Sequence, residues 1–212
     1  NVLFEHSPLV LIKYSPMLDL SQALQSLRNV TEVHVVAVDN ECKELLFRME
    51  RESSALDMKI VCVNLKKVET ESFSFYKKEE DAAPCVLADS VGRYLYEPNV
   101  SILKGGVYRL LTQRFPVGKL DVNTHLYTAD VFVPDFPGRI FEVETSFQMN
   151  KAELKRGLSG LKMANVTVRN FPQTVAQIRD RLKLKEGGDV YLFAATVKGD
   201  RRLLIRCKKA CV

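Results

Sequence analysis

The chain has 212 residues, of which 46% are hydrophobic and 27% are charged, with 5 Cys, no Trp and a formal net charge of +5. This composition indicates a globular protein of one large or two small domains. A membrane-spanning chain is excluded because no run of about 18 apolar residues occurs, and collagen because its glycine period is absent. The low content of Pro, Gly and Ser excludes a disordered chain. Residues 1–7 carry an acid and no basic region, so they do not resemble a signal peptide. The odd number of cysteines, at irregular positions, favours free thiols in a reducing cytoplasm.

The net charge is distributed unevenly along the chain. Residues 1–90 hold 10 basic and 15 acidic side chains, whereas residues 91–212 hold 21 basic and 11 acidic ones. Most of the basic excess lies in residues 149–212, with 15 basic and 5 acidic side chains. A compact segment of that charge attracts polyanions, so nucleic acid is a candidate partner. A solvated basic surface without a partner is the alternative.

Three short apolar runs in the first third of the chain predict strands, at residues 9–14 (LVLIKY), 33–38 (VHVVAV) and 59–65 (KIVCVNL). They are rich in β-branched residues and apolar at both alternating positions. This pattern is typical of strands buried on both faces of an open α/β sheet. Asp19, with Gln22 three residues later, predicts the start of one helix between the first two strands.

The predicted strands have too few helices to cover them. Residues 41–50 (ECKELLFRME) fit a short helix or a strand. One helix, or two at most, cannot cover both faces of three such strands, so we expect an open face and a hydrophobic edge. The segment is therefore predicted to be the back half of a larger α/β domain. Its front half would come from residues outside this chain, or a second subunit would cover the sheet.

The middle of the chain changes in character. Residues 69–92 are charged and interrupted by proline and glycine, and they are predicted to be a linker with one short strand at residues 73–76. A strand at residues 93–97 follows. Asn99 is predicted to cap a helix that extends to Leu111. The next 25 residues are rich in turn signals.

The last 65 residues predict a compact two-layer α+β module with the order strand, helix, strand, helix, strand, strand. Asn150 marks the start of its first helix, and residues 165–169 alternate as a strand. The second helix is predicted to end near Gly187. Residues 190–197 and 202–207 then form a hairpin.

Motifs that define local chemistry are absent from the sequence. It contains no G-x-G-x-x-G, P-loop, H-E-x-x-H or C-x-x-C, so no nucleotide, phosphate or zinc site is predicted from a motif. Cys207 and Cys211 lack companion ligands, so no metal site is predicted there.

Two polar stretches follow predicted strands and are candidates for a substrate pocket. In open α/β sheets, ligands bind at the carboxyl ends of the strands. The alternative is that the first stretch forms a turn and a helix cap, and that the second solvates a turn. The substrate-pocket candidates are Lys13, Ser15, Pro16, Asp19, Asn40, Glu41 and Lys43.

Several long segments carry a resemblance to a known family. They are LIKYSPMLDLSQAL, VTEVHVVAVDNECKELLF, RYLYEPNVSILKGGVYRLL, NTHLYTAD, FPGRIFEVE and VRNFPQTVAQIRDRLKLKEGGDVYLFA. Together they closely resemble the C-terminal half of a class I S-adenosylmethionine-dependent methyltransferase family from Bacteroidetes. The resemblance implies a fold of mixed α/β and α+β type. Its parts are a C-terminal portion of a Rossmann-like methyltransferase sheet at residues 1–68, the linker at 69–92, a ferredoxin-like segment at 93–139 and a THUMP-like domain at 140–212.

The resemblance also implies a cofactor for the parent protein. That cofactor would be S-adenosyl-L-methionine. The family's glycine-rich loop, its ribose-binding acid and its catalytic acidic stretch would all precede residue 1. No catalytic residue is therefore assigned, and no cofactor is expected to bind this chain alone.

THUMP domains accompany RNA-modifying catalytic domains, so the resemblance implies that the basic module binds RNA. Few aromatic residues interleave with its charges, so base stacking is expected to be minor. The alternative is a protein-interaction or structural module of a methyltransferase with a non-RNA acceptor. The RNA-binding candidates are Lys151, Lys155, Arg156, Arg169, Arg179, Arg181, Lys183, Lys185, Arg201 and Arg202.

Overall fold

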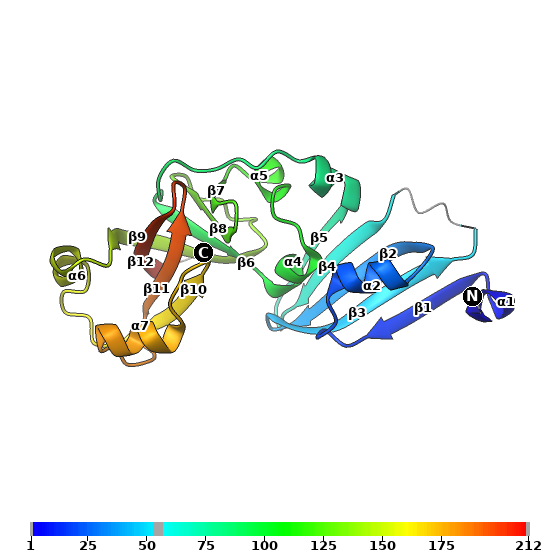
Figure 1. Cartoon of the computed structure of the whole chain (residues 1–212), viewed down its shortest axis with the longest axis horizontal. Helices are drawn as coiled ribbons and strands as arrows, with labels where there is room; N and C mark the ends of the chain where they lie inside the picture. The colour runs from blue at the N-terminus through cyan, green and yellow to red at the C-terminus, as the bar shows by residue number, and fades with distance from the viewer. Residues whose placement is uncertain (1, 53–56, 211–212) are drawn as a thin grey trace. The chain divides into compact units, whose positions relative to one another are not determined.

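The computed structural model describes residues 2–52 and 57–210, and the chain forms two compact units (Figure 1). Unit 1 comprises the residues up to Pro84 together with Asn99–Leu110, and unit 2 comprises Cys85–Pro98 and the residues from Leu111 onward. The elements of unit 1 are α1 (Val2–His6), β1 (Leu9–Tyr14), α2 (Leu20–Ser26), β2 (Val30–Val38), β3 (Glu41–Glu50), β4 (Lys59–Leu65), β5 (Thr70–Tyr76), α3 (Lys77–Ala82) and α4 (Val100–Gly105). Those of unit 2 are β6 (Tyr94–Pro98), α5 (Leu111–Arg114), β7 (Gly118–Asp121), β8 (Thr124–Ala129), β9 (Gly138–Gln148), α6 (Lys151–Gly157), β10 (Asn165–Arg169), α7 (Val175–Leu182), β11 (Val190–Val197) and β12 (Arg201–Lys209).

Unit 1 is built on a five-stranded sheet with the order β1-β3-β2-β4-β5. Strands β2 and β4 are parallel, and the other neighbours are antiparallel. Residues 41–50, for which the sequence left helix and strand open, form strand β3. A two-residue turn at Asp39 and Asn40, both at positive φ (47° and 62°), joins β2 to β3. Such a turn matches the natural twist of a hairpin, so it directs the chain back along β2.

One face of this sheet is well covered. Val33, Phe47 and Ile60 are fully buried on it, and α4 packs on β2, β3 and β4. Gly105 lets α4 approach closely, because a Cβ built there would lie 2.5 Å from Sγ of Cys62.

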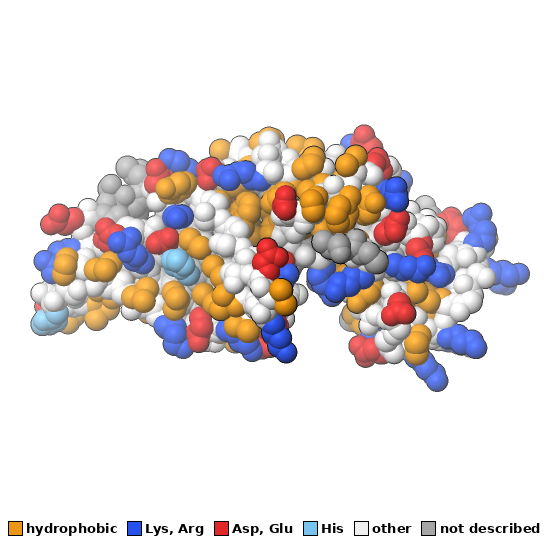
Figure 2. All heavy atoms as spheres, turned by 180° about the vertical axis from the view of Figure 1, so that it is seen from behind, with side chains coloured by type: hydrophobic (Ala, Val, Ile, Leu, Met, Phe, Trp, Pro, Cys, Tyr) orange, Lys and Arg blue, Asp and Glu red, His pale blue; other side chains and the backbone are white. Residues whose placement is uncertain are grey.

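The other face of the sheet is more open. The alternate residues of the central strands, such as Val36 and Val61, are only half-buried, and Leu11 on β1 is 65% exposed. Seen from behind in Figure 2, hydrophobic side chains appear among charged ones over this unit. Strand β1 is also an edge of the sheet, because β3 is its one strand neighbour among the described residues.

The segment predicted to be a linker, residues 69–92, differs in the structure. Residues 70–76 form β5, which pairs with β4 along its whole length and buries Phe75. Glu80 of α3 is also buried, and its carboxylate accepts hydrogen bonds from the backbone N–H groups of Tyr108, Arg109 and Leu110, which replace its contacts with water. Residues 69–84 of this segment are therefore part of the fold of unit 1, where Glu80 bonds to residues 28 to 30 positions later, and residues 85–92 belong to unit 2.

The helix expected from Asn99 to Leu111 is interrupted. Asn99 caps α4 as predicted, since its Oδ1 accepts from the backbone N–H groups of Ser101 and Ile102. Gly106 then adopts a left-handed conformation with φ of 75°, and α4 ends there. Apolar residues continue at helical spacing beyond Gly106, so the sequence pattern did not indicate that the helix ends at this glycine.

Unit 2 contains a seven-stranded sheet with the order β10-β11-β12-β9-β6-β8-β7, in which β10 and β11 are parallel. Its last part follows the predicted order, with β9, α6, β10, α7, β11 and β12 in sequence. Helix α7 ends at Leu182, before the predicted stop at Gly187, because Lys183 takes a left-handed conformation. That turn allows Leu184 to be buried. Strands β7 and β8 lie in the stretch that the sequence marked as turns.

The core of unit 2 lies on both faces of its sheet. Phe193 belongs to one cluster with Leu95 and Phe141, while its neighbour Leu192 belongs to a second cluster with Ile178 of α7. Because successive strand residues point to opposite faces, β11 contributes to both clusters. Among the described residues, no helix is long and apolar enough to cross a membrane.

Candidate nucleic-acid interface

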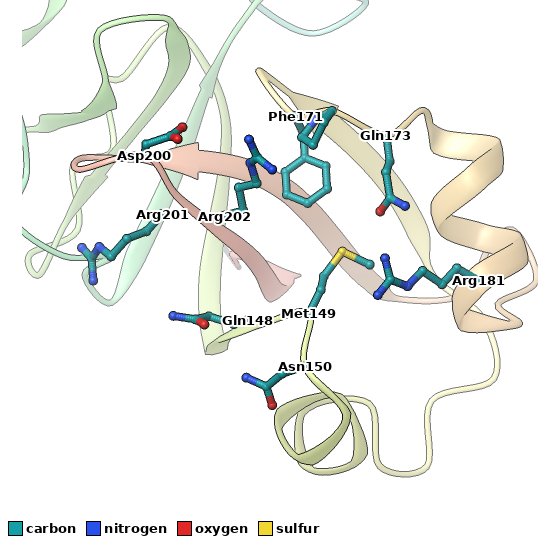
Figure 3. A pocket seen from close by; sticks show the side chains of 10 residues that line it. Gln148, Met149, Asn150, Phe171, Gln173, Arg181, Asp200, Arg201 and Arg202 are labelled. Carbon is teal, nitrogen blue, oxygen red and sulfur yellow. The ribbon is translucent and has the colours of Figure 1, made fainter.

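A cleft of about 730 Å³ opens on unit 2 (Figure 3). Four segments meet there: the end of β9 with the N-cap of α6, the loop between β10 and α7, the last turn of α7, and the turn between β11 and β12. Its lining residues are Gln148, Met149, Asn150, Phe171, Pro172, Gln173, Arg181, Asp200, Arg201 and Arg202. A second cleft of about 560 Å³ adjoins it and shares Phe171 and Arg202. The lining carries more positive than negative charge.

The loop that presents Phe171 is held by buried hydroxyl groups. Asn170 has a left-handed conformation with φ of 48°, which turns the chain out of β10. The hydroxyl of Thr196 donates to the carbonyl of Asn170. The hydroxyl of Thr124 donates to the carbonyl of Thr196 at 2.6 Å and accepts from the Asn170 amide at 3.3 Å. Phe171 itself packs partly on the second core cluster, so its ring is fixed at the edge of the cleft.

Helix α7 places Arg181 at the cleft. Thr174 and Gln177 form a capping box that fixes the start of the helix. Ile178 is fully buried and anchors the inner face, and Arg181 lies in the exposed last turn. In Figure 3 the guanidinium of Arg181 lies near the side chain of Met149.

Arg201 and Arg202 follow the turn between β11 and β12, and their side chains point in different directions. Lys198 forms a salt bridge with Asp89 at 2.5 Å, and Arg201 donates to the backbone carbonyls of Lys198 and Asp89. Arg201 is therefore tied into the turn and points away from Phe171 in Figure 3. Arg202 points the other way, toward the Phe171 ring.

The ten RNA-binding candidates fall into two groups. Arg169 is paired with the buried carboxylate of Glu97 at 2.6 Å, and Arg139 pairs with the same carboxylate. Arg179 is paired with Glu186 at 2.9 Å. Three of the candidates, Arg169, Arg179 and Arg201, therefore already bond to groups of the protein itself. Over residues 2–52 and 57–210, the structure records no salt bridge for the other seven, although Arg156 lies close enough to Glu153 to help lower the pKa of that carboxyl; the seven are Lys151, Lys155, Arg156, Arg181, Lys183, Lys185 and Arg202.

Figure 2 shows Lys and Arg side chains projecting around the part of the molecule that holds residues 138–209. Of the seven side chains without a recorded salt bridge, Arg181 and Arg202 line the cleft. Lys151 follows the N-cap Asn150, which also lines the cleft. The basic excess of the sequence therefore includes cations that are available to an anionic ligand beside a concave surface.

The first group of substrate-pocket candidates, at the end of β1, makes local contacts. Lys13 forms an ion pair with Glu44 at 2.9 Å. The Ser15 hydroxyl accepts from the backbone N–H of Met17, one residue beyond Pro16, and Asp19 caps α2 by accepting from Gln22. These contacts match the turn and helix cap that the sequence allowed. A substrate role for these residues stays a prediction.

The second group, at the turn between β2 and β3, is also engaged. The Asn40 side-chain oxygen accepts from the backbone N–H of Val100 at 2.9 Å, and its backbone N–H donates to Asn64. Lys43 pairs with Glu41 at 2.8 Å. Asn40 thus joins this turn to the start of α4, and its role in a substrate pocket likewise stays a prediction.

The titratable groups of the interior are poorly suited to nucleophilic or thiolate chemistry. Burial raises the pKa of Cys62 to about 12 and also raises the pKa of Cys207, so both thiols are protonated at neutral pH. Desolvation, with Lys119 and Arg169 nearby, lowers the pKa of His125 to about 4. In the part of the chain that the structure describes, no three His, Cys, Asp or Glu side chains group as metal ligands. Cys211 lies outside that part.

Sequence reasoning did not identify Phe171, Gln173 or Gln148 as site residues. The available signal was the segment Asn170-Phe171-Pro172-Gln173, an aromatic residue in a turn directly after a strand. The sequence predicts few aromatic residues among the basic ones, and among the described residues Phe171 is the one aromatic residue in the lining of this cleft. The fold nevertheless places its ring in the same cleft as Arg181 and Arg202.

Two family models match the chain. Residues 94–137 match a ferredoxin-like domain and residues 138–209 match a THUMP domain-like model. The chain therefore contains a ferredoxin-like domain followed by a THUMP-like domain, and the resemblance stated from the sequence is confirmed in these parts. All the residues that line the first cleft lie within the THUMP-like domain. A search of curated proteins found no match.

A solved structure from Porphyromonas gingivalis W83, described as that of a "putative methyltransferase", is similar to the whole chain. The identity is 34%, the TM-score is 0.90, and the match covers 99% of this chain and 53% of the other. The chain thus spans about half the length of that protein. The mixed α/β fold class expected from the sequence is confirmed by this likeness and by the two mixed sheets.

Proposed function

We propose that this chain is part of a cytoplasmic S-adenosylmethionine-dependent methyltransferase that acts on RNA, and that its THUMP-like domain binds the RNA. The cleft with Arg181 and Arg202 carries the proposal, because both guanidinium groups face a ligand-sized space without an acidic partner in the described residues. Arginine suits this task, since its planar donors match phosphate oxygens. The likeness to the Porphyromonas gingivalis protein supports the methyltransferase part.

The residues of this chain do not by themselves form a site for S-adenosylmethionine. The sequence has no glycine-rich nucleotide motif, and the polar groups at the ends of β1 and β2 are engaged in the local contacts described above. We therefore assign no step of methyl transfer to them. The contribution of this chain is to bind and position the RNA.

We further propose that the rest of a methyltransferase sheet covers the open edge and face of unit 1. Leu9 and Leu11 on the edge strand β1 are 49% and 65% exposed. An unpaired apolar edge of this kind favours association with another strand. The similar protein has about as much chain again outside the matched region, which is enough to supply such strands.

The RNA proposal is tested with charge reversal in the cleft. The double variant Arg181→Glu/Arg202→Glu should weaken binding of a structured RNA at low salt by at least about 10-fold, because two phosphate contacts become repulsive. A matched control reverses two exposed cations of unit 1, Arg28→Glu and Lys67→Glu, and should change affinity far less. Equal loss in both variants would indicate nonspecific attraction by net charge. Binding of a protein partner instead, insensitive to the cleft variant, would favour the interaction-module alternative.

A further inference from the structure

The cleft contains more than positive charge, since an aromatic ring and unpaired amide groups lie among its arginines. Resting on the function proposed above, we propose that it holds one unpaired nucleotide of the RNA. The base would lie on the face of Phe171, and its phosphates would lie between Arg181 and Arg202.

The size and shape of the cleft suit a single nucleotide. Its volume of about 730 Å³ is large enough for a small organic ligand, and the cleft is open to solvent. Paired RNA is bound mainly through its shape and backbone, whereas unpaired bases are splayed out, stacked on aromatic side chains and hydrogen-bonded at their edges. A concave site with one ring at its wall therefore favours an unpaired base over a duplex.

Phe171 is a preorganised stacking surface. The left-handed Asn170 and the Thr196 hydroxyl fix the backbone before it, Pro172 restricts the backbone after it, and the ring packs partly on the core. In Figure 3 the ring lies between the guanidinium of Arg202 and the side chain of Gln173. A base on this ring would reach both a cation and an amide, at little cost in side-chain entropy.

Two amides are available for the edge of the base. Asn150 is committed to Glu153, whose backbone and carboxylate it contacts as the N-cap of α6. By contrast, the structure records no hydrogen bond from the side chains of Gln148 or Gln173, among the residues that it describes. Each can donate and accept, as the edge of a nucleobase requires. Gln173 points into the cleft, beside the proposed stacking position.

The test compares two RNAs that differ in one feature. One is a blunt hairpin, and the other is the same hairpin with a short unpaired extension carrying 2-aminopurine. The intact chain should bind the extended RNA between about 5-fold and about 150-fold more tightly, the range expected for one stacked base. The 2-aminopurine fluorescence should fall on binding, because stacking quenches it.

Phe171→Leu keeps an apolar side chain but removes the stacking surface, so it should abolish the preference and leave the blunt hairpin affinity unchanged. The matched control is Phe132→Leu, a half-buried ring of unit 2 that packs on Tyr94. It should keep the preference.

The outcomes separate the two proposals. Equal binding of both RNAs, or unchanged fluorescence on binding, would overturn the nucleotide site while leaving RNA binding intact. Failure to bind either RNA at low salt would overturn the proposed function itself. If Phe171→Leu does not fold, the 2-aminopurine fluorescence measured with the unaltered chain still decides whether the unpaired base stacks on binding. A preference retained in folded Phe171→Leu would contradict the placement of the base.

Discussion

Thr196→Val tests how the fold positions Phe171. The Thr196 side chain is 7% exposed, and its hydroxyl donates to the carbonyl of Asn170. Valine keeps the volume and removes the donor, so the partly buried carbonyl loses its partner. Such a loss costs about 1–2 kcal/mol, which lowers the melting temperature of a chain of this length by about 2–8 °C.

The same substitution should reduce the preference for RNA with an unpaired extension, because the loop before Phe171 loosens. Thermal denaturation and the two-hairpin titration measure the two effects. The control is Thr128→Val, which removes a buried hydroxyl that donates to the carbonyl of Tyr94 at 2.7 Å and accepts from the backbone N–H of Gly92 at 2.8 Å. It should destabilise the chain but keep the RNA preference. Loss of the preference in both variants, or in neither, would refute a specific positioning role for Thr196.

Three further predictions concern the rest of the chain. Gly105→Ala should destabilise unit 1 by about 1–3 kcal/mol in urea denaturation, because the new Cβ would lie 2.5 Å from Sγ of Cys62; an unchanged midpoint would mean that α4 does not approach β4 so closely. The folded pKa of His125, about 4, lies below the usual value of 6.5, so the folded state binds fewer protons between these values. Stability should therefore be lost as pH falls from about 6.5 to about 4, and His125→Gln should flatten the melting temperature over that range, whereas an identical slope would contradict the shift. Leu11→Lys should lower concentration-dependent light scattering of the isolated chain by placing a charge on the open edge of β1, and no decrease would argue against association through that edge.

The strands were largely predictable where local pattern determines them. Residues 9–14, 59–65 and 165–169 have the predicted bounds, because runs of β-branched residues between turn signals favour strands. Strand β5 was underestimated and strands β7 and β8 were missed, since their short apolar stretches lie among charged or turn-forming residues. Their pairing depends on neighbours elsewhere in the sheet.

The site was less predictable than the fold. The sequence identified the basic segment, but it could not separate Arg181 from Arg169, whose partner Glu97 lies 72 residues earlier. Likewise, Phe171 lines the cleft because Thr196 holds the preceding residue from a distance of 26 positions along the chain. Such partners are fixed only by the tertiary structure, so charge and composition indicated the region and not its individual contacts.

The salt dependence of RNA binding tests the central claim most directly. Each phosphate contact contributes about −0.7 to −0.9 to the slope of log K against log salt concentration. The double variant Arg181→Gln/Arg202→Gln should therefore have a slope shallower by about 1.4–1.8, while Arg28→Gln/Lys67→Gln, with the same net charge, keeps the original slope. Equal slopes for the intact chain and the cleft variant would contradict RNA binding by these two arginines.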